Sequence, residues 1–232
     1  MRLLIVSTSS IHGKPYLTYL KDEVISFFAG KNLIFIPYAR PGGITWDEYT
    51  AKASERFTEW GFNMRGLHTF ENPIQALKEA DGVFTGGGNT FVLVKTLYDL
   101  GLMDPLREAV QNGLPYMGSS AGSNLTGLTV RTTNDMPIVY PPSFDALALV
   151  PFNINPHYLD PIPDSTHMGE TRETRINEFH HFNEQPVIGL REGSWLRREG
   201  ESLELKGPLP ARLFRKDAAP IERQPGDWSD LL

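Results

Sequence analysis

Short apolar runs alternate with amphipathic stretches through the first half of the chain. The runs are rich in β-branched or aromatic residues and end at polar or glycine residues, which is typical of buried parallel strands. The stretches between them carry apolar residues at helical spacing. Expected strands cover residues 3–6, 33–37, 64–68, 82–85 and 114–117, and expected helices cover residues 16–28, 45–60, 72–77, 91–100 and 104–112. This alternation predicts an α/β fold with a doubly wound, mostly parallel sheet flanked by helices.

The pattern is less regular after residue 129, where prolines are frequent. Further strands are expected near residues 150–154 and at residues 187–190, 195–198, 202–205 and 211–214, with a polar helix over residues 169–182. The two strands on either side of Gly200 predict a C-terminal β-hairpin. Residues 216–232 are polar, contain two prolines and are expected to form a loose tail. The chain shows neither a repeat nor a linker, so we expect a single domain of residues 1–232.

The net charge of the 232-residue chain is −6, which argues against nucleic acid as a partner. The chain contains no cysteine, and this excludes disulfides, a cysteine nucleophile and thiolate metal ligands. No segment approaches the roughly 18 apolar residues that cross a membrane, and the first apolar run is too short for a signal peptide. We therefore expect a soluble, cytoplasmic protein without membrane contact. A monomer and a homodimer are both compatible with the sequence.

Residues 118–122 read Gly-Ser-Ser-Ala-Gly, and the Gly-x-Ser-x-Gly spacing is that of a nucleophile elbow. In such an elbow the central serine, here Ser120, lies on a strained turn between a strand and a helix. The same residues also fit an ordinary turn. An oxyanion hole needs two backbone N–H groups directed at one point, and Ala121 would supply one and Gly88 the other. A phosphate cradle is the alternative for the glycine-rich turn at residues 86–88, which lacks the lysine of a P-loop.

A nucleophilic serine needs a base, usually a histidine that a carboxylate holds in place. His157 is the best candidate, because it follows an apolar strand and a proline at the expected edge of a sheet. His180, by contrast, is expected on the solvated face of the polar helix. Glu192 follows the strand at residues 187–190 and is a candidate for the carboxylate, with Asp135 as a rival. On local grounds alone, His157 also fits an incidental loop histidine and Glu192 a solvated hairpin charge.

Six blocks of the sequence together resemble peptidase E, the α-aspartyl dipeptidase family. The blocks are residues 86–91, 118–122, 131–139, 154–157, 169–172 and 187–193, and the resemblance extends from the first strand to about residue 205. It implies a serine peptidase with the flavodoxin-like fold of class I glutamine amidotransferases, and neither metal nor cofactor. It also implies that Ser120 is the nucleophile, His157 the base and Glu192 the residue that orients the base. This order differs from the order Ser, acid, His of α/β-hydrolases.

The substrate implied by the resemblance is a small peptide, a dipeptide with an N-terminal aspartate. Arg172 would bind the aspartate β-carboxylate, since a guanidinium can donate two parallel hydrogen bonds to it. Without the resemblance, Arg172 fits equally well as a charge partner on a polar helix. Asn89 and Asp135 are further candidates for substrate binding, Asp135 as the partner of the free ammonium. Three other functions stay open: a serine hydrolase of β-aspartyl linkages similar to cyanophycinase, an esterase, and a non-catalytic binding module.

Overall fold

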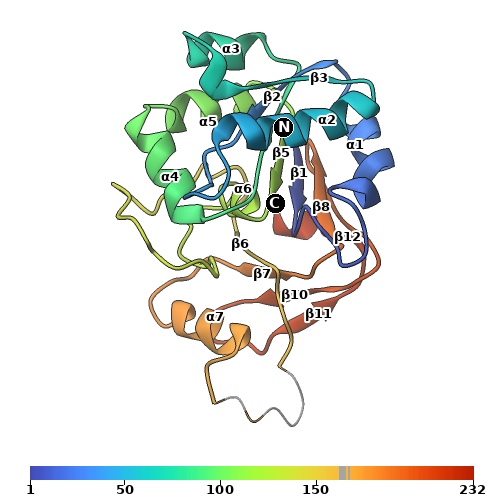
Figure 1. Ribbon diagram of the computed structural model, residues 1–232. Helices are drawn as coiled ribbons and strands as arrows, with labels where there is room; N and C mark the ends of the chain where they lie inside the picture. Colours follow the sequence, from blue (N-terminus) through green and yellow to red (C-terminus); the bar gives the residue numbers. More distant parts are fainter. Residues whose placement is uncertain (162–165, 167) are drawn as a thin grey trace.

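The computed structural model describes residues 1–161, 166 and 168–232. In this part of the chain the larger sheet has eight strands (Figure 1). Their order is β12 (Gly226–Asp227), β9 (Ser202–Lys206), β8 (Trp195–Glu199), β1 (Arg2–Val6), β5 (Tyr116–Ser119), β4 (Gly82–Thr85), β2 (Asn32–Ile36) and β3 (Asn63–Gly66). The strands from β1 to β3 in this order run parallel, and β8, β9 and β12 extend the sheet in the antiparallel sense. The expected C-terminal hairpin is therefore β8–β9, and it pairs directly with β1.

Helices cover both faces of this sheet, as the sequence pattern predicts. Helices α1 (Lys21–Phe27) and α2 (Trp46–Glu59) pack on the face that carries Leu4 and Val6. Helices α3 (Pro73–Glu79), α4 (Thr90–Asp99) and α5 (Met103–Gln111) pack on the opposite face, with Leu3 and Ile5. The helices that precede β2 and β3 thus lie on one face, and those that precede β4 and β5 lie on the other. This change of face confirms the doubly wound fold, in which ligands bind at the carboxyl ends of the strands.

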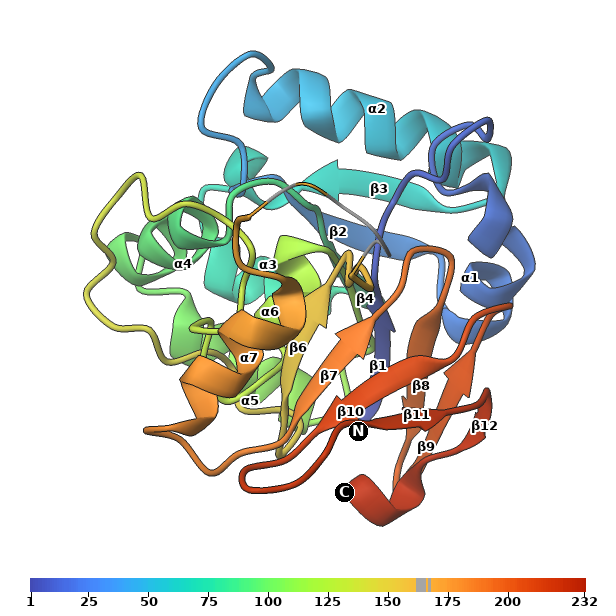
Figure 2. The same ribbon diagram turned by 90° about the horizontal axis from the view of Figure 1, so that it is seen from below.

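A second sheet lies below the first in Figure 1, and the sequence pattern did not predict that it would be separate. Its strand order is β11 (Ile221–Arg223), β10 (Ala211–Phe214), β7 (Val187–Leu190) and β6 (Asn153–Pro156). One face of it, with Ile154 and Ile188, joins the apolar core on the α3–α5 side of the large sheet. The view from below in Figure 2 shows α7 (Arg172–His180) on the other face, where Ile176 packs on Tyr158.

Three expectations are wrong, two about the lengths of helices and one about the C-terminal segment. The expected helix at residues 16–28 is a single 3-10 turn (Thr18–Leu20) followed by the short α1, and the polar helix α7 is shorter than residues 169–182 at both ends. The expected loose tail is folded: it contributes β11, β12 and a 3-10 turn (Ser229–Leu231), and the side chain of Trp228 is 1% exposed. Of the helices that the structure describes, none combines the length and the apolar character that crossing a membrane requires.

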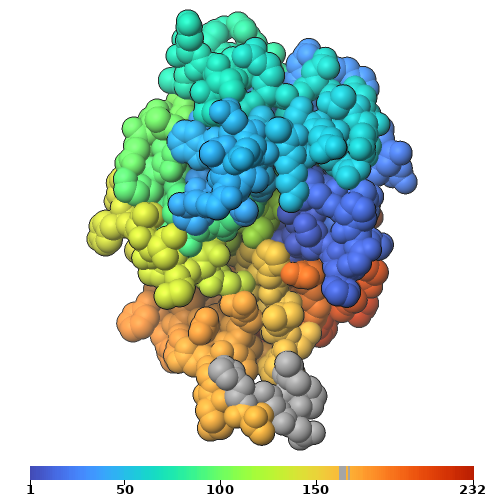
Figure 3. All heavy atoms as spheres, viewed as in Figure 1, coloured from blue at the N-terminus to red at the C-terminus, as the bar shows by residue number. Residues whose placement is uncertain are grey.

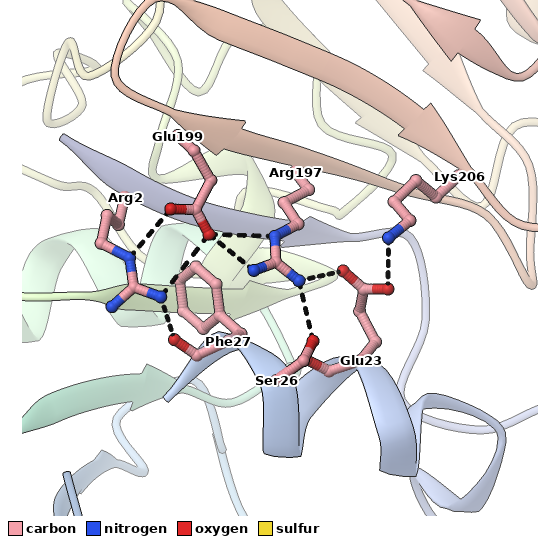
Figure 4. A network of polar contacts seen from close by, with 7 residues as sticks. All are labelled: Arg2, Glu23, Ser26, Phe27, Arg197, Glu199 and Lys206. Atoms are coloured by element: carbon pink, nitrogen blue, oxygen red, sulfur yellow. Dashed lines mark hydrogen bonds and ion pairs between the residues drawn. The ribbon is translucent and has the colours of Figure 1, made fainter. Parts of the chain in front are cut away.

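A network of ion pairs joins α1 to the hairpin β8–β9 (Figure 4). Arg197 on β8 contacts Glu23 on α1 at 2.8 Å and Glu199 at 2.6 Å. Lys206 on β9 contacts the second oxygen of Glu23 at 2.7 Å, and Arg2 on β1 reaches Glu199 at 3.2 Å. The Glu23 side chain is only 10% exposed, so its two cationic partners replace most of the water that a carboxylate requires. The network thereby fastens the antiparallel edge of the sheet to the helix that covers it.

Candidate active site

The carboxyl end of β5 forms a sharp turn into the short helix α6 (Ala121–Asn124), and Ser120 lies at this turn. Ser120 has φ 55° and ψ −109°, a conformation that residues with a side chain rarely adopt. The flanking glycines make the turn possible: a Cβ on Gly118 would lie 2.2 Å from the carbonyl oxygen of Gly122, and a Cβ on Gly122 2.3 Å from that of Thr85. The strand, strained serine and helix match the geometry of a nucleophile elbow.

Two turns at the ends of β6 and β7 bring His157 and Glu192 to Ser120. The Nε2 atom of His157 lies 3.0 Å from Ser120 Oγ, and its Nδ1 atom lies 2.6 Å from Glu192 Oε1. With the carboxylate accepting the Nδ1 proton, Nε2 is the free acceptor that faces the serine hydroxyl. The side chains of His157 and Glu192 are 35% and 48% exposed, so the pair is open to small molecules from solvent. The three residues named from the sequence are thus joined by one chain of hydrogen bonds.

The glycine-rich turn after β4 lies against the serine. A Cβ on Gly87 would be 3.1 Å from Ser120 Cβ, and Gly88 has φ +147° with its Cα hydrogen turned toward Ala39. Within the described residues, neither the N–H of Gly88 nor that of Ala121 has a protein acceptor. Both N–H groups are therefore without a protein acceptor in this part of the chain, which is one requirement of an oxyanion hole.

Tyr49 on α2 supports this turn, and sequence reasoning did not find it. Its hydroxyl donates to the carbonyl oxygen of Gly87 at 3.1 Å, and Tyr49 is 5% exposed. The residue was included only in an expected helix, because its partner lies 38 positions away in the sequence. The N-terminus of that helix does carry a signal that can be read locally, because Thr45 and Glu48 form a capping box.

Asn89 and Asp135 hold the loop beside the site. Asn89 caps α4, where its Oδ1 accepts from two backbone N–H groups, while its Nδ2 donates to the carbonyl of Met136 at 2.9 Å. Oδ2 of Asp135 accepts from the N–H of Thr90 at 2.7 Å and from Thr133 Oγ1 at 3.1 Å. The amide of Asn89 is thus engaged on both sides by the protein. Asp135 keeps its second oxygen, Oδ1, without a hydrogen-bond partner among the described residues.

Arg172 is the first residue of α7 and is half-buried. Burial lowers the pKa of its guanidinium, as does the charge of Arg175, while the charge of Asp135 acts in the opposite direction. Among the described residues no carboxylate pairs with Arg172, whereas its neighbours Glu173 and Arg175 pair with Arg212 at 2.8 Å and with Glu170 at 3.6 Å. The structure therefore does not show Arg172 as a charge partner within its own helix.

His180 corrects one expectation from the sequence. It was expected on a solvated face, but it is 5% exposed and its Nε2 donates to the carbonyl of Gln185 at 3.1 Å. The sequence of α7 is mostly polar and does not indicate which side of the helix is buried, because only two of its residues, Ile176 and His180, are buried. In the part of the chain that the structure describes, no three His, Asp or Glu side chains are grouped to hold a metal ion.

The segments that carry the site meet on one face of the molecule. Figure 3 shows the light-blue segment that leads into α2, the yellow-green segment that contains Asp135 and the gold segment that follows β6 beside one another on this face. Hydrogen bonds join the yellow-green segment to two neighbours: Asn89 Nδ2 donates to the Met136 carbonyl, and Asn134 Nδ2 donates to the carbonyl of Pro156 at 2.6 Å. The loop that contains Asp135 is thus held between the turn after β4 and the end of β6.

Comparison with known proteins identifies the family. The sequence matches peptidase family S51 over residues 3–206. The chain belongs to peptidase family S51. It is 53% identical over 234 residues to peptidase E of Streptomyces coelicolor, covering 100% of this chain and 95% of that protein. It is 50% identical over 235 residues to a probable alpha-aspartyl dipeptidase of Drosophila melanogaster, covering 99% of this chain and 97% of that protein. The resemblance to peptidase E is confirmed, and the S51 chain is a serine-type peptidase.

Solved structures support the fold of this S51 peptidase. A peptidase from an acI-B1 Actinobacterium superposes with a TM-score of 0.72 at 19% identity, covering 96% of this chain and 93% of that one. A putative peptidase E protein from Listeria monocytogenes superposes with a TM-score of 0.65 at 22% identity, covering 89% of this chain and 98% of that one. At these identities the likeness concerns the fold alone.

Proposed function

We propose that this S51 peptidase hydrolyses dipeptides with an N-terminal aspartate through an acyl-enzyme on Ser120. The observation that carries the proposal is the 3.0 Å contact between His157 Nε2 and Ser120 Oγ at the top of a strained elbow. The substrate class is supported by the name of the Drosophila relative, a probable alpha-aspartyl dipeptidase at 50% identity.

The first half of the reaction forms the acyl-enzyme. His157 accepts the Ser120 proton at Nε2 while Oγ attacks the carbonyl carbon of the aspartyl residue. Glu192 accepts a hydrogen bond from Nδ1 and stabilises the imidazolium that results. The N–H groups of Gly88 and Ala121 bind the negatively charged oxygen of the tetrahedral intermediate. His157 then gives its proton to the leaving amine, the C–N bond breaks and the second amino acid departs.

The second half releases aspartate. A water molecule gives a proton to His157 Nε2 and attacks the acyl carbon, and the same two N–H groups bind the new oxyanion. The imidazolium returns the proton to Ser120 Oγ as the ester bond breaks. The exposure of His157 and Glu192 gives this water access to the base.

Specificity for aspartate rests on two charges of opposite sign. Arg172 pairs with the β-carboxylate of the substrate, since its guanidinium has no carboxylate partner in the described part of the protein. Oδ1 of Asp135 accepts from the free α-ammonium. We assign these two side chains, whose charges interact, to the two charged groups of the aspartyl residue.

A dipeptide panel tests the proposal. Ser120→Ala is expected to lower kcat on α-Asp-X dipeptides by roughly 10⁴-fold, because only the oxyanion hole and binding remain. Ser54→Ala is the matched control, since the Ser54 hydroxyl on α2 binds the Met64 carbonyl and takes no part in the site. Near-full activity of Ser120→Ala would show that the assigned nucleophile is wrong.

The same panel separates the alternatives. Arg172→Ala is expected to reduce kcat/KM for Asp-X by about 10²-fold or more while changing turnover of Ala-X much less. Equal losses on both would remove Arg172 from substrate recognition. Preferential turnover of β-Asp-X would favour a β-aspartyl hydrolase, and turnover of p-nitrophenyl esters without peptides an esterase. A chain that a serine-reactive phosphonate does not label would be a binding module.

A further inference from the structure

Ser7 is the first residue after β1, and the structure places it between the segments of His157 and Glu192. Its Oγ donates to the carbonyl oxygen of Leu190 at 2.8 Å and accepts from the backbone N–H of His157 at 3.0 Å. Ser7 is 0% exposed. One buried hydroxyl thus connects the backbone of His157 to the end of β7, from which Glu192 follows two residues later.

The backbone of His157 needs such a partner. His157 has φ 53°, in the left-handed region that residues other than glycine seldom occupy. β6 ends at Pro156, opposite Leu190 in the parallel ladder, and the next bond to Leu190 comes from the N–H of Tyr158 at 3.1 Å. The N–H of His157 is therefore outside the ladder, and Ser7 is its acceptor. A buried N–H without an acceptor is costly, so this bond restrains the turn that aims the imidazole.

The neighbouring residue holds the nucleophile in the same way. The carbonyl oxygen of Val6 accepts from the N–H of Ser120 at 3.1 Å, and Val6 pairs with Ser119 in the ladder between β1 and β5. Two consecutive residues at the end of β1 thus bind the backbones of Ser120 and His157. Both Val6 and Ser7 are fully buried, so they form a rigid reference for the distance between the serine and the imidazole.

We propose that Ser7 is a positioning residue for the peptidase reaction. It holds the His157 turn and the Glu192 segment in register with the elbow, so that Nε2 stays at hydrogen-bond distance from Ser120 Oγ. It touches neither substrate nor reacting atoms. This inference rests on the proposed roles of Ser120, His157 and Glu192.

Ser7→Ala tests the inference, with Ser194→Ala as the matched control. Ser194 is equally buried and its hydroxyl also donates to a backbone carbonyl, that of Leu209 at 2.9 Å. Among the described residues, this hydroxyl forms no hydrogen bond with His157, Leu190 or Glu192. Ser7→Ala is expected to lower kcat on Asp-X about tenfold or more with KM within about twofold, because geometry and not ground-state binding is lost. Ser194→Ala is expected to keep kcat near that of the wild type.

The folded fraction distinguishes positioning from simple stabilisation. A merely destabilised variant loses kcat in proportion to its unfolded fraction, whereas a displaced imidazole lowers kcat at an unchanged folded fraction. Ser7→Cys keeps a small group with a weak donor and acceptor and is expected to recover part of the lost kcat.

Labelling of Ser120 by a serine-reactive phosphonate separates this inference from the proposed function. Wild type labelled rapidly and Ser7→Ala labelled at least about fivefold more slowly, at equal folded fraction by circular dichroism, supports the positioning role. Equal labelling rates and an unchanged kcat would overturn it while leaving the proposed function intact. A wild type that is not labelled at all would instead overturn the proposed function.

Discussion

Replacement of Tyr49 by Phe removes the hydroxyl that contacts the glycine-rich turn and keeps the aromatic ring. The Tyr49 ring packs edge-on against Phe35 with centroids 4.9 Å apart, and Phe retains this contact. The carbonyl of Gly87, which accepts from the hydroxyl, shares a peptide unit with the N–H of Gly88. No cis peptide occurs in the described chain, so this carbonyl and this N–H point in opposite directions. The Tyr49 hydroxyl therefore orients the Gly88 N–H by holding the carbonyl group at the opposite edge of the same peptide unit.

The size of the effect follows from this indirect action. Loss of an oxyanion donor itself lowers kcat by about 10²–10³-fold, whereas one neutral hydrogen bond contributes about 1 kcal/mol. Tyr49→Phe leaves the donor in place but frees its peptide plane, so kcat is expected to fall about 5- to 10-fold, or about 1–1.4 kcal/mol in activation free energy. Burial raises the pKa of Tyr49, so the hydroxyl stays protonated and remains a donor throughout the neutral range.

Steady-state kinetics on Asp-X and binding of a peptidyl boronate measure the effect. The boronate is expected to bind Tyr49→Phe more weakly by the same factor as the loss in kcat, because its oxygen occupies the oxyanion hole, while KM changes little. Tyr98→Phe is the control, since its hydroxyl donates to the Asp145 carbonyl at 3.3 Å at the far end of α4. An unchanged kcat in Tyr49→Phe, or the same loss in Tyr98→Phe, would refute the reasoning.

Two further substitutions test the fold around the site by chemical denaturation. Glu23→Gln is expected to lower the free energy of unfolding by about 1–3 kcal/mol at pH 7, since Arg197 and Lys206 lose a largely buried partner. Burial raises the pKa of Glu23, but hydrogen bonds and charges from Lys206 and Arg197 outweigh it and leave the pKa below the usual 4.5. The contribution of Glu23 to stability is therefore fully present above about pH 4.5 and is lost as pH falls through the folded pKa. The difference in free energy of unfolding between wild type and Glu23→Gln should accordingly disappear in acid. A difference that does not depend on pH would contradict the pairing. Trp228→Ala is expected to destabilise the protein by about 3–5 kcal/mol, as loss of a buried aromatic does, and a midpoint equal to that of the wild type would show that the C-terminal segment is not part of the cooperative fold.

Local features of the sequence were sufficient for most elements of the large sheet. A strand such as β1 or β2 is buried on both faces, so its continuous apolar run is visible without knowledge of its neighbours. The start of α2 depends on a capping box between Thr45 and Glu48, which are only three residues apart in the sequence. Ser120 could be named because the elbow's glycines lie two positions before and after it in the sequence.

Pairing between distant segments was beyond the sequence pattern. Three strands of the small sheet, β6, β7 and β10, were expected individually, whereas β11 was not. Their separation into a second sheet depends on which partners they find, such as β10 beside β7. The C-terminal segment reads as polar and loose, and only the core beneath it explains why Trp228 is buried. Conformational preferences within a short window carry no information about such contacts.

The sequence by itself determined the succession of strands and helices along the chain as far as residue 214, and it identified the serine of the elbow. Through the resemblance to a family, it also indicated which histidine and which glutamate to consider. Only the tertiary structure decided how these groups are held. Ser7 binds the backbone of a residue 150 positions later, and Tyr49 supports a turn 38 positions away. A hydrogen bond between such residues forms only once the two sheets have packed together and placed the ends of β1, β4, β6 and β7 near one another. A short stretch of sequence does not predict such a contact, because each partner by itself is an ordinary residue at a strand end or in a helix.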